Sequence, residues 1–220
     1  MSLSVVLLDL DDTLIDRTGA FAAALRERLG AKLAPDKLEA VLPELLLLDD
    51  RGRRERPEFW RAAIGKAPAL GWDPKELQAW GAPAIAERIQ PDPQVRAALE
   101  ALRGRGLTLG LVTNGAGKHQ REKLERAGLA DLFQTIVISS EVGVRKPDPA
   151  IFLRALEQLG VGPGAALHVG DDPERDVEAA RRAGLSAAWV EREAWPGELA
   201  PAALVLRQVT ELPARLAEMS

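Results

Sequence analysis

The sequence predicts an α/β fold in which a parallel β-sheet lies between two layers of helices. Two observations lead to this prediction. Along most of the 220-residue chain, short apolar segments of strand length alternate with amphipathic segments of helical length. The alternation is interrupted once, after the first predicted strand, by a long segment that has helical patterns only. A sheet with one helical insertion accounts for both features.

The predicted strands are short, apolar and mostly flanked by polar or turn-forming residues, as expected for the buried strands of a parallel sheet. They are residues 5–8, 107–112, 135–138, 166–169, 187–190 and 203–206. In such sheets ligands bind at the carboxyl ends of the strands. Polar residues that follow these strands are therefore the first candidates for a functional site.

Helices are predicted between the strands, because start and stop signals frame the segments. Asp92-Pro93 and Asp148-Pro149 each combine a capping carboxylate with a proline at the first helical position. Helices over 118–127 and 174–183 each end at a glycine. This arrangement predicts a Rossmann-like three-layer α/β/α core formed by residues 1–15 and 89–220.

Residues 16–88 are predicted to form a small all-helical cap between the first and second core strands. The expected cap helices lie around residues 21–29, 38–48 and 59–64, and one more begins at Asp73-Pro74. The charged run 49–56 between two of them is expected to be a mobile loop.

Two groups of cap residues have more than one interpretation. One is aromatic: Phe59, Trp60, Trp72 and Trp80. It would form the core of the cap, the interpretation we favour, or line a pocket for an aromatic or sugar group. The other is basic: Arg51, Arg53 and Arg54. It could bind a carboxylate or a second phosphate, although such runs are more often solvated loops.

Composition excludes several classes of function. The chain has no cysteine, which excludes disulfides, thiolate catalysis and cysteine-ligated metals. Its only histidines are His119 and His168, so a metal would be held mainly by oxygen, as Mg²⁺, Ca²⁺ and Mn²⁺ are. A net charge of −4 gives no reason to expect a nucleic-acid or anionic-membrane partner. No segment has the pattern of a signal peptide or membrane span, so the expected compartment is the cytoplasm.

Four polar clusters lie near the ends of predicted strands, and each suits one part of phosphate chemistry. A carboxylate pair could attack phosphorus and move a proton, provided that a cation compensates the charge. A hydroxyl with backbone N–H groups suits phosphate oxygens, a lysine neutralises a phosphoryl group, and acidic residues bind a hard cation. In chain order the clusters are Asp9 with Asp11, Thr113-Asn114-Gly115, Lys146, and Asp171 with Asp172.

Each cluster has a simpler explanation when it is taken alone. Asp9 and Asp11 could merely end a strand in a turn. Thr113 could belong to an ordinary polar turn, and Lys146 could be a solvated surface charge. Asp171 or its neighbour could cap a helix. What favours a functional site is that all four clusters occur together and in this order.

In this order the clusters resemble the motifs of the haloacid dehalogenase superfamily. The segments 113–124, 139–149 and 168–171 are also similar to it, and the resemblance covers nearly the whole chain except the cap. It implies a Mg²⁺-dependent phosphatase acting on a small-molecule phosphate monoester. The segment 112–130 looks most like the subgroup of nucleotidases and N-acylneuraminate phosphate phosphatases. We expect a monomer or a homodimer.

The resemblance also implies a role for each site residue. Asp9 would be the nucleophile that forms an aspartyl-phosphate, and Asp11 the general acid and base. The phosphoryl group would be held by Thr113, Asn114 and Gly115, with Lys146 offsetting the negative charge. Mg²⁺ would be bound by Asp9, the Asp11 backbone carbonyl and Asp171, with Asp172, or less directly Asp176, as a further ligand.

Three alternatives remain open. A 2-haloacid dehalogenase shares the fold and the nucleophile, but it needs no metal and normally lacks the second aspartate of the first motif, so Asp11 argues against it. A sugar phosphomutase would return the phosphoryl group to a sugar, and the cap carries no motif for that. A catalytically silent binding module would usually have lost one of the site residues, and here all are present.

Overall fold

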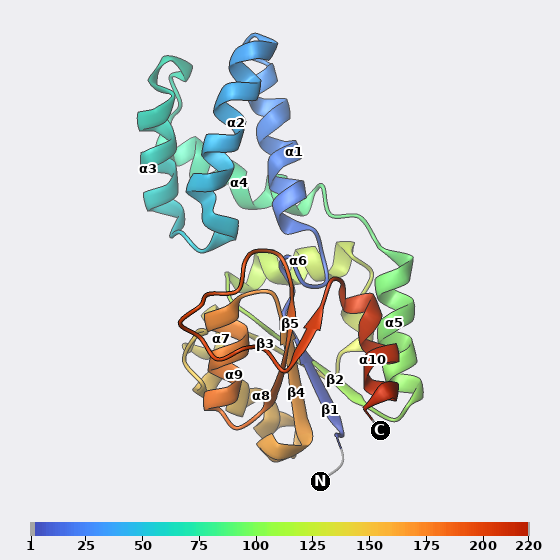
Figure 1. The fold of residues 1–220 in the computed structure, drawn as a ribbon. Coiled ribbons are helices and arrows are strands. Elements are labelled where there is room, and N and C mark those ends of the chain that lie inside the picture. Colours follow the sequence, from blue (N-terminus) through green and yellow to red (C-terminus); the bar gives the residue numbers. More distant parts are fainter. Residues whose placement is uncertain (1–2, 220) are drawn as a thin grey trace. The chain divides into compact units, whose positions relative to one another are not determined.

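The computed structural model describes residues 3–219 of the chain, which divides into two compact units (Figure 1). The first unit consists of the part of the chain up to Ile15 together with the part from Pro91 onwards. The second unit is Asp16–Gln90 and contains the segment predicted as a cap. Among the described residues, no helix has both the length and the apolar character needed to cross a bilayer.

The first unit is built on a parallel sheet whose strands follow the order β3-β2-β1-β4-β5-β6 in the described part of the chain. The strands are β1 Val5–Leu8, β2 Thr108–Thr113, β3 Thr135–Ile138, β4 Ala166–Gly170, β5 Ser186–Val190 and β6 Leu204–Leu206. The central strand β1 is buried throughout and lies between β2 and β4. The predicted Rossmann-like α/β fold is confirmed.

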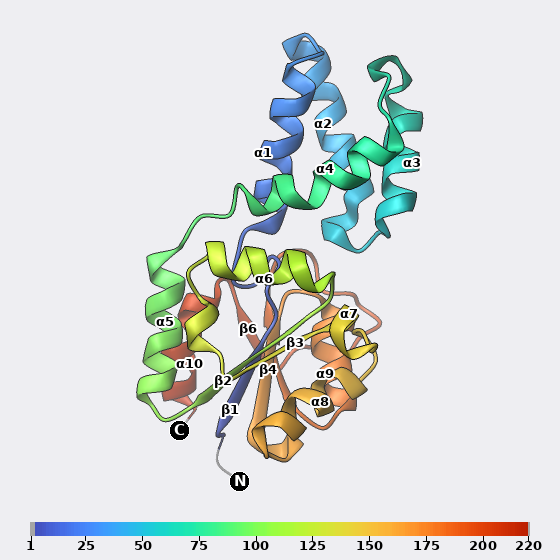
Figure 2. The same ribbon diagram turned by 180° about the vertical axis from the view of Figure 1, so that it is seen from behind.

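Helices cover both faces of this sheet (Figure 2). On one side lie α5 Pro93–Gly104 and α10 Leu212–Glu218, and on the other α7 Ser139–Val142, α8 Ala150–Leu159 and α9 Ala179–Arg182. Helix α6, Gly117–Arg126, follows the carboxyl end of β2. The predicted start of α5 is confirmed, because the Asp92 side chain accepts hydrogen bonds from the backbone N–H groups of Gln94 and Val95.

The segment after β4 differs from the single helix predicted over 174–183. It begins as a π-helix, Pro173–Glu178, and only its end is the α-helix α9. The carbonyl of Asp172 accepts from the N–H of Val177 at 3.3 Å, a five-residue spacing that widens the turn. Such π segments occur frequently at functional sites, and this one carries Asp176.

The second unit is a bundle of α-helices in the described part of the chain: α1 Arg17–Gly30, α2 Pro35–Asp49, α3 Arg56–Lys66 and α4 Pro74–Ala86. Its centre is aromatic. Phe59 and Trp60 are buried, and their rings meet edge to face with centroids 4.6 Å apart. Phe21 of α1 packs against both of them. The interpretation of Phe59 and Trp60 as core residues of this helical segment is confirmed.

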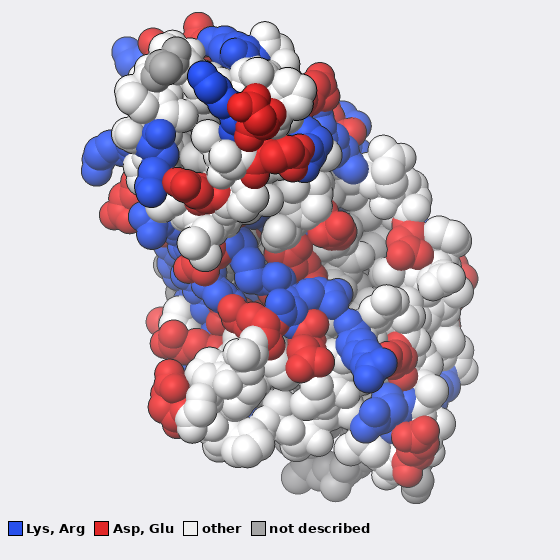
Figure 3. All heavy atoms as spheres, turned by 45° about the horizontal axis from the view of Figure 1, so that its top comes forward, with Lys and Arg blue, Asp and Glu red and all other residues white. Residues whose placement is uncertain are grey.

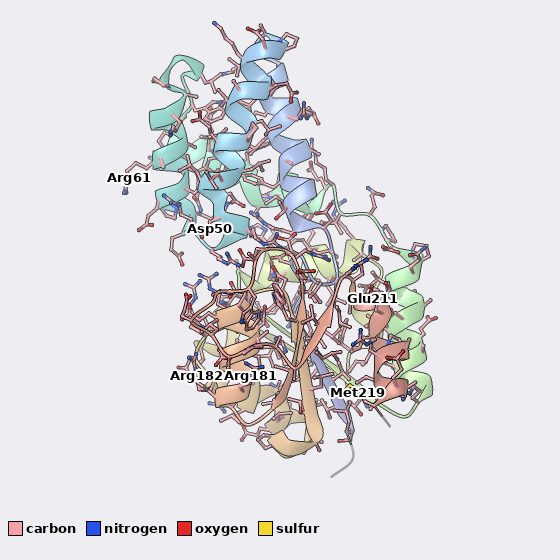
Figure 4. The ribbon with its side chains drawn as sticks, in the orientation of Figure 1. Asp50, Arg61, Arg181, Arg182, Glu211 and Met219 are labelled. Atoms are coloured by element: carbon pink, nitrogen blue, oxygen red, sulfur yellow. The ribbon has the colours of Figure 1, made fainter. Side chains whose placement is uncertain are left out.

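The charged run 49–56 is not the simple solvated loop that the sequence suggested. The Asp49 carboxylate is buried, and both Arg17 and Arg56 form ion pairs with it. It also accepts a hydrogen bond from the Gly52 N–H at 3.0 Å. Asp50, labelled at the end of α2 in Figure 4, begins a short 3₁₀-helix. Arg17, which neutralises Asp49, comes from a different helix, so no pattern within the run indicates this contact. The mobility expected for the run stays a prediction.

Elsewhere on the surface of the second unit, basic and acidic side chains are intermixed (Figure 3). Arg26 with Glu39, and Lys66 with Glu44, are examples of exposed ion pairs there. Exposed pairs of this kind contribute little to stability.

Candidate active site

The polar clusters meet at the carboxyl edge of the central strands of the first unit. Asp9 follows β1, Thr113 ends β2 and Asp171 follows β4. Because β2 and β4 are the two neighbours of β1, these three residues are brought together by strand order alone.

Lys146 is buried at this edge, with only 3% of its surface exposed. Its Nζ lies 2.7 Å from Oδ1 of Asp9 and 2.6 Å from Oδ1 of Asp176. Burial alone would lower the pKa of Lys146, but the two carboxylates outweigh it and raise the pKa above its ordinary value. The side chain is therefore a buried ammonium, and the interpretation as a solvated surface charge is wrong.

The two carboxylates that share Lys146 respond differently to their surroundings. Burial raises the pKa of Asp9 to about 7, and the negative charges of Asp176 and Asp11 add to the effect, whereas Lys146 opposes it. Burial also acts on Asp176, but Lys146 and His168 outweigh it and hold the pKa of Asp176 well below its ordinary value. The protein groups alone thus make the ionised form of Asp9 the costly one.

Asp9, Asp171 and Asp176 form the acidic part of the site. All three are buried, and each offers a carboxylate oxygen within 4.8 Å of the others. Three carboxylates and one ammonium carry a formal charge of −3 + 1 = −2 when all are ionised. A divalent cation would neutralise this charge, and carboxylate oxygens are the ligands that Mg²⁺ prefers. The donor set therefore fits Mg²⁺.

Asp172 does not join this acidic group, although the sequence ranked it ahead of Asp176. Its carboxylate caps the π-helix by accepting from the N–H groups of Glu174 and Arg175, at 3.0 and 2.8 Å. The backbone N–H of Asp172 in turn donates to Oδ2 of Asp176 at 3.0 Å. The wide turn after β4 thus brings the later aspartate, Asp176, into the acidic group, and which of the two would contact a metal stays a prediction.

The segment after β2 holds two of the predicted residues in place. Thr113 is buried, and its Oγ1 accepts a hydrogen bond from Nε2 of Gln120 at 2.7 Å. The Asn114 side chain donates to the Lys146 carbonyl and accepts from the Lys146 N–H, both at 2.9 Å. Asn114 therefore fixes the backbone that carries Lys146, a role that the sequence did not suggest. The Gly115 N–H donates to the Ser139 hydroxyl at 3.0 Å.

Asp11 is held by two residues of α6 to which the sequence analysis assigned no role. Nζ of Lys123 lies 2.5 and 2.6 Å from its two carboxylate oxygens, and Nε2 of Gln120 lies 3.2 Å from Oδ2. A signal was present, since Gln120, Lys123 and the buried Leu124 have the spacing of one helix face. The pattern did not show which carboxylate the lysine would meet.

His168 is a fully buried side chain of β4. Its Nε2 lies 2.9 Å from Oδ1 of Asp176, and the Phe152 ring packs against the imidazole. Burial lowers the pKa of His168, although Asp176 opposes the shift, and so favours the neutral form of the ring. The histidine supports the acidic group from the side of the sheet.

The motifs at the ends of β1, β2 and β4 match a known family. The sequence profile described as haloacid dehalogenase-like hydrolase matches residues 3–184. The chain belongs to this family. The predicted resemblance is confirmed, and the chain is a hydrolase.

Three relatives of the chain are phosphatases. The phosphoserine phosphatase of Thermus thermophilus is 36% identical, over 86% of this chain and 89% of the relative. The glyceraldehyde 3-phosphate phosphatase of Methanopyrus kandleri is 34% identical, over 83% and 82% of the two chains. The N-acylneuraminate-9-phosphatase of Mus musculus is 32% identical, over 85% and 82%. The last is of the subgroup to which the segment 112–130 pointed.

Solved structures of the family share the fold. The HAD-hydrolase YfnB of Bacillus subtilis, in a magnesium-bound structure, has a TM-score of 0.79 and 23% identity, with 98% of this chain and 99% of that chain covered. A 2-haloacid dehalogenase of Pseudomonas syringae has a TM-score of 0.61 and 30% identity, with coverage of 99% and 100%. Both phosphatases and dehalogenases are thus related to this chain, and the residues of the site must distinguish them.

Proposed function

We propose that the chain is a Mg²⁺-dependent phosphatase that hydrolyses a small-molecule phosphate monoester through an aspartyl-phosphate on Asp9. The observation that carries the proposal is the buried group in which Lys146 bridges Asp9 and Asp176 beside Asp171. Phosphoryl transfer needs a positioned nucleophile and neutralised negative charge, and this group supplies both.

The first half-reaction transfers the phosphoryl group to the protein. A carboxylate oxygen of Asp9 attacks phosphorus, and the bond from phosphorus to the ester oxygen breaks. Asp11 donates a proton to that oxygen, so that an alcohol leaves. The Thr113 hydroxyl accepts from Gln120 and has its own hydrogen to donate to a phosphoryl oxygen.

The second half-reaction hydrolyses the aspartyl-phosphate. Asp11, now ionised, takes a proton from a water molecule as the water oxygen attacks phosphorus. The bond between phosphorus and Asp9 breaks, which releases phosphate and restores the carboxylate. Lys146 offsets the negative charge in both halves. Mg²⁺ held by Asp9, Asp171 and Asp176 would neutralise charge on the phosphoryl oxygens.

A dehalogenase is the competing function, because a 2-haloacid dehalogenase shares 30% identity with the chain. That reaction uses an aspartate nucleophile, but it has no need of a second carboxylate that carries protons or of a cation site. Asp11 and the buried acidic group therefore favour the phosphatase.

The test is an assay of the purified protein with Mg²⁺ against a panel of phosphate monoesters and of 2-haloacids. We expect phosphate release from a small ester that stops with a chelator and in Asp9→Asn, which replaces the nucleophile at nearly constant volume. Activity that persists in Asp9→Asn or ignores the chelator would refute the mechanism. Halide release without any phosphate release would establish the dehalogenase instead.

A further inference from the structure

The side chain of Asp11 is fixed by two residues that the reaction does not otherwise require. Lys123 contacts both carboxylate oxygens, and its own side chain is only 8% exposed. The side-chain amide nitrogen of Gln120 donates hydrogen bonds to both Asp11 and Thr113, and Gln120 is itself buried. One amide thus connects the proposed general acid with the hydroxyl proposed to hold the phosphoryl group.

This arrangement differs from an ordinary surface ion pair. Taking an ammonium group out of water is costly unless a partner compensates it, and Lys123 lies on the buried face of α6 with its charge directed at Asp11. Contact with both carboxylate oxygens also restricts rotation of the carboxylate. The other lysine of the same helix, Lys118, is exposed to solvent.

We propose that Lys123 is a positioning residue for Asp11, and that Gln120 keeps this carboxylate aligned with Thr113. The inference rests on the proposed function. Asp11 can transfer a proton only if one of its oxygens lies within hydrogen-bonding reach of the ester oxygen. Because the phosphoryl group is held at Thr113, a fixed arrangement of Asp11 and Thr113 fixes the proton donor relative to the substrate.

The consequence depends on the leaving group. An alkyl phosphate needs a proton on its leaving oxygen, whereas p-nitrophenolate leaves readily without one. The value of kcat/KM reports on steps up to cleavage of the ester bond. We therefore expect Lys123→Met to lower kcat/KM for an alkyl phosphate by about tenfold or more, and for p-nitrophenyl phosphate by less than about threefold.

The experiment compares these two esters as substrates of the full chain with saturating Mg²⁺. The alkyl phosphate is phosphoserine, or whichever alkyl ester of the panel the wild type hydrolyses fastest. Asp11→Asn is the reference variant, in which kcat/KM should also fall more for the alkyl phosphate than for p-nitrophenyl phosphate, and by a larger factor than in Lys123→Met. Lys123→Arg keeps the charge and should restore part of the loss, while Lys118→Met removes an exposed charge from the same helix and should change neither value.

Two results would overturn the inference. One is that Lys123→Met leaves kcat/KM unchanged for both esters. The other is that it lowers kcat/KM equally for both, as a general structural defect would. Lys123→Gln takes its place if thermal unfolding shows that the methionine variant is not folded, and the same criteria apply. Failure of the proposed function is distinguishable, because the wild type would then hydrolyse neither ester or Asp9→Asn would remain active.

Discussion

Replacing Gly170 by alanine would disturb the acidic group without removing any of its functional atoms. Gly170 is the last residue of β4, and a methyl group at this position would overlap the Asp176 side chain. Asp176 cannot easily move away, because Lys146, His168 and the backbone N–H of Asp172 all contact its carboxylate. The glycine is therefore needed for the close approach of Asp176.

Two routes of relaxation exist, and both are costly. If Asp176 stays, the backbone at residue 170 must shift, and overpacking of this kind costs about 1–3 kcal/mol. If Asp176 moves, the buried Lys146 loses one of its two carboxylate partners, and loss of a buried hydrogen-bonding partner costs about 1–3 kcal/mol. For a protein of this size such a loss lowers the unfolding temperature by about 2–4 °C per kcal/mol.

The assay is thermal and chemical unfolding of Gly170→Ala, together with its activation by Mg²⁺. We expect the free energy of unfolding to fall by about 1–3 kcal/mol. The Mg²⁺ concentration needed for half-maximal activity should rise about tenfold or more, since displacing a carboxylate of the acidic group would weaken metal binding. Gly104→Ala is the control, because nothing lies within 4 Å of the added methyl group at the end of α5. If Gly170→Ala matched the wild type in both stability and Mg²⁺ response, the reasoning about Asp176 would be refuted.

Four further predictions concern the ion network of the second unit and the acidic site. Asp49→Asn should lower the free energy of unfolding by about 3–5 kcal/mol in chemical denaturation, since it leaves Arg17 buried without its charged partner; Glu39→Gln, in an exposed pair, should have no measurable effect. Arg17 and Arg56 outweigh burial and lower the pKa of Asp49, so ionised Asp49 stabilises the fold above about pH 3.9, and this stabilisation is lost as the pH falls through the lower pKa of the folded state. If Asp49→Asn destabilised the protein equally at low and at neutral pH, this prediction would be contradicted. With the pKa of Asp9 raised to about 7, protons should compete with Mg²⁺, so calorimetric affinity for Mg²⁺ should increase from about pH 6 to about pH 8 and not stay constant. His168→Leu should weaken Mg²⁺ activation by about tenfold or more, and an unchanged response would exclude a supporting role for the imidazole.

The sequence by itself determined the elements and the edge of the sheet where the site lies. Periodicity, capping aspartates and helix-ending glycines act over a few residues, so the strands and the helix ends that carry these signals were predicted within a residue or two, whereas the cap helices 21–29, 38–48 and 59–64 are longer in the structure. The positions of Asp9, Thr113 and Asp171 at strand ends were also local information. That they would meet followed from a general property of parallel sheets, whose carboxyl ends share one edge.

Only the tertiary structure decided which side chains face one another. Asp172 and Asp176 follow the same strand, and a π-turn together with a capping interaction directs the second toward Asp9 and leaves the first at the helix end. Lys123 meets Asp11 across 112 residues of sequence. Such contacts depend on how segments that are distant in sequence pack together. Burial makes an unpaired charge costly, so each buried charge needs a partner, but the local sequence does not indicate which residue the partner is.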